Sequence, residues 1–358
     1  MSQSKQIAVS RPADASPHRA IRQLGHSLSA RPLGRWLVGL LRRQVQSGPL
    51  SGGYNTLMRV FAAPDHLTFR ARPARPARDR EAALTVITAN LWHDWPRRRR
   101  QRARLEAFAQ LVEAEGADLL LLQEVARFGD LQVDAWLADR LGMAYVYGQA
   151  NGDLQHGAFE EGVAVLSRYP LVAPSLCYLA PRPFSLVRRL AVSVTVKAPG
   201  GDFLAVSAHL GHGRKLNTRQ LNKLQEWVEA SAADRPAIVG GDFNTGENSP
   251  QMRRLRQRWL DLFRQANPAG DGSTYHLRWP WGNPMLSQRL DYLFLRQGPS
   301  PWRVKEAQAI QSPELNHSDH LAVVTRLATG GDLPGRQRPN QASRTSVPVA
   351  DLRGSMLQ

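Results

Sequence analysis

The fold is decided by the sequence Ala237-Ile238-Val239-Gly240-Gly241-Asp242-Phe243-Asn244. Its apolar first half predicts a short buried strand, and we expect its glycines where the chain must turn sharply. Asp242 and Asn244 are two residues apart, so their side chains point roughly the same way at the strand end. A carboxylate can hold a water or a metal, and an amide can donate to an oxyanion. Phosphate-ester hydrolysis needs both groups within a few ångströms, so the stretch predicts a site of that kind.

Other apolar runs predict further strands, most of them with polar residues at or near an end. The predicted strands cover residues 84–89, 117–122, 163–167, 190–197, 203–209, 291–296 and 321–326. Helices are expected at about 98–115, where Gly116 is placed to end the helix, and at about 216–231. Adjacent strand pairs interrupted by helices indicate packed sheets with helices outside. Strict alternation of strand and helix is absent, which argues against a doubly wound parallel sheet.

The polar residues at the strand ends have a coherent chemistry. Glu124 is a hard oxygen ligand suited to Mg²⁺ or Mn²⁺, and Asn90 can add a neutral oxygen. The chain has one cysteine and no His-x-x-x-His sequence, so a zinc site is not indicated. Asp291 could reach across the sheet to His320 and orient its imidazole.

Each residue also has a structural explanation when taken singly. Glu124 could be a turn residue, and His209 could be a hydrogen-bonded core histidine. Asp291 could pair with an arginine, and Asp319 could cap a helix or turn. These alternatives weaken together, because chance does not place all of the residues in one order.

The order of the motifs points to a family. They are Asn90, Leu122-Gln123-Glu124, the run from Glu161 to Arg168, His209-Leu210, Gly241-Asp242-Phe243-Asn244, Arg289-Leu290-Asp291-Tyr292 and Ser318-Asp319-His320. Over residues 83–327 this order resembles the endonuclease/exonuclease/phosphatase family. The resemblance implies an α+β fold of the DNase I type, a four-layer sandwich of two mostly antiparallel sheets flanked by helices. It also implies hydrolysis of a phosphate ester at one rim, with Mg²⁺ or Mn²⁺ as cofactor.

The resemblance implies a metal site made of three residues. Glu124 is expected to be the principal ligand of the metal. Asn90 is expected close to the metal, and Asp319 near the metal or its waters.

The resemblance also implies a catalytic group of five residues. Asp242 is expected to orient and deprotonate the attacking water, and Asn244 to hold a phosphoryl oxygen. His209 is expected to contact the phosphate. Asp291 is expected to position His320, which binds the phosphate or acts in proton transfer, and the general base is left open between Asp242 and His320.

The substrate class stays open between several alternatives. The arginine-rich run at 97–102 favours nucleic acid, because clustered positive charge can follow a phosphate backbone. Val125-Ala126 after Gln-Glu departs from the Thr-Lys of the abasic-site repair branch and looks closer to sphingomyelinase-like hydrolases. We expect a metal-dependent phosphodiesterase, first of all a nuclease. A sphingomyelinase-like phospholipid phosphodiesterase and an inositol-phosphate phosphatase are alternatives, and a relative that only binds is disfavoured.

The formal net charge of +17 lies mostly outside the segment with the motifs. Residues 1–80 carry 14 Lys or Arg against 3 Asp or Glu, whereas residues 81–327 carry 29 against 25. The first 80 residues predict a basic, partly disordered extension with a short amphipathic helix at 31–45. That helix could dock on the catalytic body or hold an anionic membrane surface. Residues 71–80 are typical of a linker, and residues 328–358 of a disordered tail.

The single cysteine, Cys177, excludes an intrachain disulfide and disfavours a secreted, disulfide-stapled enzyme. No apolar run approaches the length of a membrane span, and no signal peptide is recognisable. We therefore expect a cytoplasmic protein and a monomer.

Overall fold

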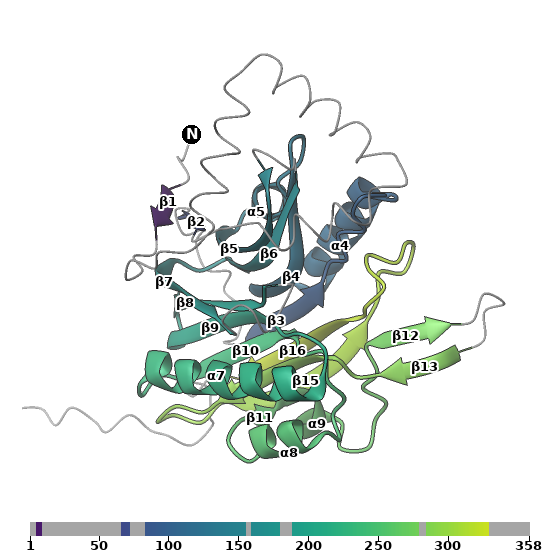
Figure 1. Cartoon of the computed structure of the whole chain (residues 1–358). Helices are drawn as coiled ribbons and strands as arrows, with labels where there is room; N and C mark the ends of the chain where they lie inside the picture. The colour runs from purple at the N-terminus through teal and green to yellow at the C-terminus, as the bar shows by residue number, and fades with distance from the viewer. Residues whose placement is uncertain are drawn as a thin grey trace, which may run out of the picture.

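Two β-sheets lie face to face in the computed structural model of the chain, which describes residues 5–8, 66–71, 83–154, 159–179, 188–278 and 284–328 (Figure 1). The larger sheet contains β1 (Lys5–Ala8), β2 (His66–Arg70), β3 (Ala83–Asn90), β4 (Leu119–Phe128), β5 (Ala144–Asp153), β6 (Phe159–Ser167), β15 (Arg303–Ile310) and β16 (Ala322–Ala328). The smaller sheet contains β7 (Leu171–Tyr178), β8 (Leu190–Ala198), β9 (Gly201–His209), β10 (Ala237–Asp242), β11 (Leu260–Asp261) and β14 (Asp291–Arg296). The helices are α4 (Gln101–Glu115), α5 (Val133–Leu141), α7 (Arg214–Ala232), α8 (Pro250–Arg256) and α9 (Leu262–Ala266).

The strand order and strand directions define a mostly antiparallel sandwich. The larger sheet runs β1-β2-β5-β6-β4-β3-β16-β15 and the smaller runs β11-β14-β10-β9-β8-β7. Among the described strands the parallel pairs are β3–β4 and β9–β10, and each is joined through a helix, α4 or α7. All other pairs are antiparallel, so the mostly antiparallel sandwich expected from the sequence is confirmed.

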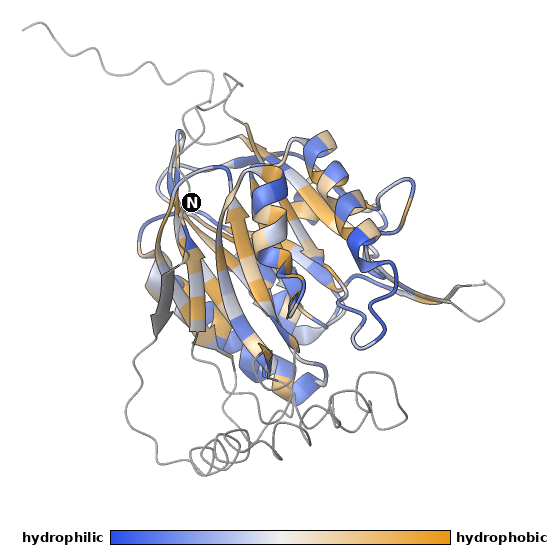
Figure 2. Cartoon of the chain, turned by 90° about the horizontal axis from the view of Figure 1, so that it is seen from above, coloured by the Kyte–Doolittle hydropathy of each residue, from blue (hydrophilic) through white to orange (hydrophobic). Residues whose placement is uncertain are grey.

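Apolar side chains pack in three layers between four layers of secondary structure. One cluster joins α4 and α5 to the outer face of the larger sheet. A second lies between the two sheets, and a third joins the smaller sheet to α7 and α8. The view from above in Figure 2 shows hydrophobic positions along the inner strands and hydrophilic positions on the outer helices. The packing sequence is therefore helix, sheet, sheet, helix, as predicted.

The two glycines of β10 do not serve the purpose that we assigned to them. Gly240 and Gly241 lie inside the strand and not at a turn. A Cβ on Gly241 would lie 1.9 Å from the carbonyl oxygen of Ala208 in β9, and one on Gly240 would lie 2.7 Å from Leu121 Cδ1 of the facing sheet. Close approach of a neighbouring strand and of the second sheet therefore requires glycine at these positions.

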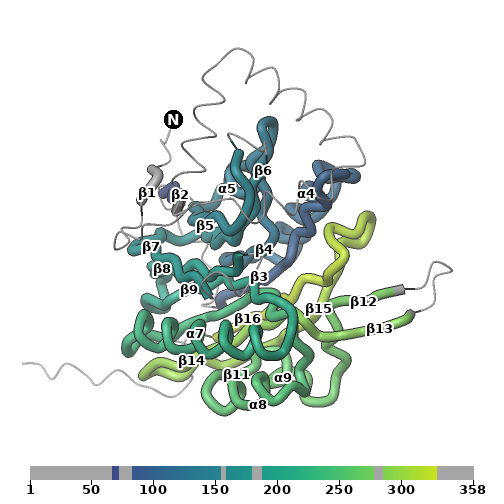
Figure 3. The backbone as a smooth tube through the Cα atoms, viewed as in Figure 1, coloured from purple at the N-terminus to yellow at the C-terminus, as the bar shows by residue number. Residues whose placement is uncertain are grey.

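Several elements differ from the sequence expectation. The helices begin and end within three residues of their predicted limits, and Gly116 ends α4 in the left-handed conformation at φ 63°. β4, in contrast, continues beyond Glu124 to Phe128. Elements that we did not predict are α5, α8, α9, β1, β2, β5, β7, β11, β15 and the two strands of a hairpin, β12 (Tyr275–Arg278) and β13 (Pro284–Gln288). This hairpin projects away from the sheets (Figure 3).

The N-terminal extension contributes to the folded body. β2 pairs with β5, β1 pairs with β2, and Leu67 is buried, so the larger sheet includes strands from before residue 83. The helix predicted at 31–45, residues 72–80 of the predicted linker and residues 329–358 of the predicted tail lie outside the described residues. Within the part that is described, no helix has the length and apolar character needed to cross a bilayer.

Candidate active site

Three of the predicted site residues lie side by side at one level of the smaller sheet. β10 runs between β9 and β14, and Asp242 is the register partner of His209 on one side and of Asp291 on the other. His209 Nε2 lies 3.4 Å from Asp242 Oδ2. All three residues are buried, so the row forms the floor of a site and not part of an exposed surface.

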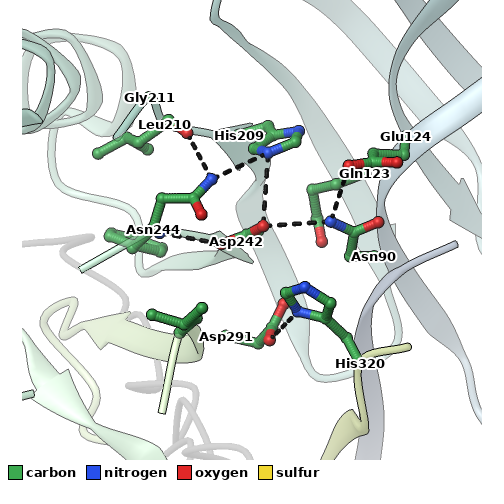
Figure 4. A network of polar contacts seen from close by, with 12 residues as sticks. Asn90, Gln123, Glu124, His209, Leu210, Gly211, Asp242, Asn244, Asp291 and His320 are labelled. Atoms are coloured by element: carbon green, nitrogen blue, oxygen red, sulfur yellow. Dashed lines mark hydrogen bonds and ion pairs between the residues drawn. The ribbon is translucent and has the colours of Figure 1, made fainter. Parts of the chain in front are cut away.

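Asn244 is folded back over this row by the turn that follows β10. Its backbone has φ 48°, a left-handed conformation that asparagine tolerates better than most residues. Its N–H donates to Asp242 Oδ1 at 2.9 Å, and its Nδ2 donates to the carbonyl oxygen of Leu210 at 2.8 Å. The turn thereby fixes the amide of Asn244 beside His209 (Figure 4).

The larger sheet brings Asn90 and Glu124 against the same carboxylate. Asn90 Nδ2 donates to Asp242 Oδ2 at 3.1 Å and to Glu124 Oε1 at 3.3 Å, so it bridges the two sheets (Figure 4). Glu124 has φ 52° and lies in a β-bulge, where the register of β4 with β6 shifts between Leu122 and Val125. Bulges commonly redirect a side chain at a site, and this one allows Glu124 to face the rim although β4 continues.

Asp291, at one end of this row, holds His320 in place. His320 Nδ1 lies 2.8 Å from Asp291 Oδ2, and Thr274 Oγ1 donates to the same oxygen at 2.6 Å. Among the residues that the structure describes, Asp291 has no arginine partner: the nearby Arg289 donates to both carboxylate oxygens of Asp261 at 2.6 and 2.9 Å. Asp291 Oδ1 is buried and has no hydrogen-bond partner among the described residues.

The predicted residues meet around one cavity of about 530 Å³. Its lining includes Asn90, Glu124, His209, Asp242, Asn244, Asp319 and His320. Asp291 does not line the cavity and reaches it through His320. Six of the seven motif stretches are thus brought to a single pocket, and the run from Glu161 to Arg168 does not line it.

The charges in the cavity divide into an acid that is ionised and an imidazole that is protonated. Burial alone would raise the pKa of Asp242, but the hydrogen bond from His209, the charge of His320 and the N–H of Asn244 hold it well below its usual value. Burial alone would lower the pKa of His320, but the charge and hydrogen bond of Asp291 raise it to about 10. At neutral pH the pocket therefore holds a carboxylate and an imidazolium next to each other.

The arrangement of oxygen donors fits a hard divalent cation. Burial raises the pKa of Asp319, and the negative charge of Glu124 adds to that effect. A cation near these two carboxylates would relieve their repulsion. Carboxylate and amide oxygens are the ligands that Mg²⁺ and Mn²⁺ prefer.

Arg189 is a residue of the cavity that sequence reasoning missed. It precedes β8, and its Nη1 donates to His209 Nδ1 at 2.8 Å. That bond leaves the proton of a neutral His209 on Nε2, facing Asp242. We searched for polar residues where strands end, whereas β8 is antiparallel to β9, so the start of β8 lies at the rim. Arg188-Arg189 directly before an apolar strand was the available signal.

The arginine run at 97–102 is largely engaged in ion pairs. Arg98 and Arg102 lie at 3.0 and 3.7 Å from the carboxylate of Asp130, and Arg99 lies at 3.0 Å from that of Asp94. These contacts explain much of the run as local structure of the loop before α4. The support that it gave to nucleic-acid binding is correspondingly weaker.

Comparison with known proteins agrees with this fold. The chain is 29% identical over 208 residues to the uncharacterised protein YbhP of Escherichia coli K12, covering 54% of this chain and 79% of YbhP. TDP2 from D. rerio, solved with a single-strand DNA product, superposes with a TM-score of 0.56 and 16% identity, covering 69% of this chain and 99% of that one. A mannosyl-6-phosphatase from Bacteroides thetaiotaomicron superposes with a TM-score of 0.54 and 20% identity, covering 68% and 99%.

At these identities the two structural matches establish the shared fold and leave the substrate open. A family model that spans residues 87–320, and with them every predicted site residue, also matches the chain. The protein belongs to the endonuclease/exonuclease/phosphatase family.

Proposed function

We propose that the chain is a divalent-metal-dependent phosphodiesterase. The observation that carries this proposal is the row of His209, Asp242 and Asp291 across three strands, with Asn90 and Glu124 of the other sheet set against its centre. Family membership supports a phosphoester hydrolase in general. The specific chemistry below follows from the residues of this chain.

Glu124 and Asp319 would hold the metal through their carboxylate oxygens, and Asn90 would lie close to it, since all three residues line the cavity. A bound Mg²⁺ or Mn²⁺ would polarise a phosphoryl oxygen and offset the charge that develops on it. Asn90 would also keep Asp242 and Glu124 in a fixed relation, because its amide donates to both carboxylates.

Asp242 is the better proton acceptor of the two residues that we left open. His320 is protonated at neutral pH, because Asp291 raises its pKa to about 10, and an imidazolium has no lone pair for a proton. Asp242 is ionised and is held by three donors, from Asn90, Asn244 and His209. In this assignment Asp242 orients and deprotonates the water, and the His320 imidazolium binds a phosphoryl oxygen.

Three further donors can surround the phosphoryl group. Asn244 Nδ2 uses one N–H for Leu210 and also lies 3.2 Å from His209 Nε2. Because the neutral His209 carries its proton on Nε2, it cannot accept the second N–H, which is available for a phosphoryl oxygen. Arg189 and His209 add positive or polar groups at the same end of the cavity. Preorganised donors of this kind stabilise charge on the oxygens of the transition state, where their effect on rate is greatest.

Nucleic acid is the first substrate class to test. Arg189 and Arg214 line the cavity and would face the charges of a polyanion. TDP2, which was solved with a single-strand DNA product, is a protein of the same fold. Because two residues of the arginine run share Asp130, we assign no phosphate contact to them.

A lipid phosphodiester is the second candidate, and the hairpin β12–β13 favours it. Leu277, Met285 and Leu286 of this hairpin are 38%, 52% and 42% exposed, and they are three of the four large apolar side chains exposed in the described residues. Tyr275 and Gln288, at the base of the same hairpin, line the cavity. An apolar projection next to the site would suit a substrate held in a bilayer. Membrane contact through residues 31–45 stays a prediction.

The experiment is a substrate panel with the purified full-length chain in Mg²⁺ or Mn²⁺, each reaction repeated with a chelator. The panel holds single- and double-stranded DNA, RNA, sphingomyelin and phospholipid vesicles, inositol phosphates and bis-p-nitrophenyl phosphate. We expect chelator-sensitive cleavage of bis-p-nitrophenyl phosphate and of nucleic acid. Cleavage of lipid alone would replace the first substrate class by the second, and no cleavage of any phosphodiester would refute the proposal.

A further inference from the structure

We propose that three buried residues outside the cavity lining, His93, Glu161 and Asn151, position Glu124 and Arg189 for the hydrolysis proposed above, on which this inference rests. The three side chains form a continuous hydrogen-bonded path from the metal end of the cavity to its phosphate end. His93, Glu161 and Asn151 are 7%, 4% and 0% exposed. Burial of a carboxylate between two polar partners is costly unless its oxygens are satisfied, and here they are.

His93 acts as a donor toward two carboxylates. Its Nδ1 accepts a hydrogen bond from the backbone N–H of Trp95 at 3.0 Å, so the neutral ring carries its proton on Nε2. Nε2 lies 3.0 Å from Glu161 Oε2 and 3.6 Å from Glu124 Oε2. The backbone N–H of His93 also donates to Glu124 Oε2 at 3.4 Å.

This tautomer decides between two explanations of the cluster. One ligand atom each of His93, Glu124 and Glu161 lie within 4.8 Å of one another, which by distance alone fits a metal site with a histidine ligand. A metal bound at Nε2 would use the lone pair of that nitrogen, so the ring proton would have to lie on Nδ1. Nδ1 already accepts the N–H of Trp95 and cannot carry the proton. His93 therefore orients the carboxylates by donation and does not bind the metal itself.

Glu161 connects this donor to the second half of the path. Its Oε1 accepts from Asn151 Nδ2 at 3.0 Å. Glu161 lies in β6, between two strands whose register with β6 shifts close to it. In β5 the shift falls between Gln149 and Asn151, and in β4 it falls between Leu122 and Val125. The next position, Gly162, must be glycine, because a Cβ there would lie 2.0 Å from the carbonyl oxygen of Gly148. The backbone is thus shaped around this carboxylate.

Asn151 fixes the backbone from which Arg189 extends. Its Oδ1 accepts from the N–H of Arg188 at 2.9 Å, and its Nδ2 donates to the carbonyl oxygen of Arg188 at 3.1 Å. Both backbone groups of Arg188 are therefore bound by one side chain, directly before the guanidinium that contacts His209. Loss of Asn151 would release Arg189 without touching Glu124.

The test separates the two ends by two independent readouts. Binding of Mn²⁺ to the full-length chain is measured by electron paramagnetic resonance of the free ion, without substrate. KM and kcat are measured with bis-p-nitrophenyl phosphate at saturating Mn²⁺. His93→Ala should weaken Mn²⁺ binding by about 10-fold or more and leave KM within about two-fold, because outer partners of metal ligands commonly contribute that much affinity. His93→Gln, which restores a side-chain donor, should recover part of the loss.

Asn151→Ala should show the reverse, a KM raised several-fold with unchanged Mn²⁺ binding, and Glu161→Ala should change both. The matched control is Gln149→Ala, a buried residue of the same strand whose side chain donates to the backbone of Gly152. It should change neither quantity, and a thermal unfolding curve for each variant identifies any that fails to fold. Asn151→Ser serves in place of Asn151→Ala if the latter does not fold, since it is smaller yet keeps a polar group.

Two results would overturn the inference. In the first, the wild type is active, and the His93 and Asn151 variants bind Mn²⁺ and substrate as it does. This result leaves the proposed function standing. The other is an equal change of both quantities in every variant, including the control, which would indicate general loosening of the fold. A wild type that neither binds Mn²⁺ nor hydrolyses the ester would refute the proposed function itself, and this inference with it.

Discussion

Substitution of Gly241 by alanine tests how the fold positions the site. The added Cβ would lie 1.9 Å from the carbonyl oxygen of Ala208, whereas an ordinary contact of this kind is about 3.4 Å or longer, so β9 and β10 must separate by more than 1 Å. Overpacking costs about 1–3 kcal/mol, and hydrogen bonds of the parallel β9–β10 pair would weaken at about 1 kcal/mol each. We therefore expect Gly241→Ala to destabilise the protein by about 3 kcal/mol or more.

For a domain of this size that loss corresponds to a fall in Tm of about 6–12 °C. Differential scanning calorimetry measures it, with Gly129→Ala as the control, since no atom lies within 4 Å of the Cβ added there. Because Asp242 and His209 are register partners across the same strand pair, hydrolysis should fall as well. A Gly241→Ala protein with the Tm of the wild type would refute the explanation of this glycine and of the close strand approach.

Two further predictions concern buried groups away from the cavity. Tyr147 has no hydrogen-bond partner for its hydroxyl among the described residues, and burial raises its pKa well above the usual value. An unfolded tyrosine ionises near pH 10, so above that pH the unfolded state loses a proton that the folded state keeps, and stability falls. Between pH 9 and 11 the free energy of unfolding, followed through Tm, should fall less for Tyr147→Phe than for the wild type, by about 1.4 kcal/mol at pH 11. Parallel pH curves for the two proteins would contradict this. Arg289→Met leaves the buried Asp261 without one of its partners and should cost about 3 kcal/mol by urea denaturation, whereas Arg140→Met at a surface pair should cost under about 1 kcal/mol. Equal effects of the two arginine variants would count against the buried pair.

The convergence of the site could be predicted because it depends on regular structure. Asn90 and Asp242 are each the last residue of an apolar strand that belongs to a strand–helix–strand unit, and such strands end at one edge of a sheet. The period of apolar residues is enough to find those strands. The contact between the two side chains, however, comes from the stacking of the sheets, which no local pattern encodes.

The features that escaped prediction depend on tertiary contacts. Glu124 adopts φ 52° inside an apolar strand, and nothing in Leu122-Gln123-Glu124-Val125 marks a bulge there. β5 contains glycine and asparagine, which are poor strand formers, and forms because β2 and β6 pair with it on both sides. Gly241 is required by the approach of Ala208, a neighbour more than 30 positions away in the sequence.

The most direct test of the proposed mechanism is the rate of bis-p-nitrophenyl phosphate hydrolysis by the wild type, Asp242→Ala and His320→Ala, measured with and without a chelator. We predict turnover by the wild type in Mg²⁺ or Mn²⁺, its loss on chelation, and a fall of at least about 100-fold in each variant. Asp242→Ala should keep a Tm close to that of the wild type, because it removes the repulsion between the Asp242 and Asp291 carboxylates. His320→Ala leaves the buried Asp291 without its partner and should lower the Tm by several degrees. Variants that hydrolyse the ester like the wild type while unfolding at a much lower temperature would contradict the account.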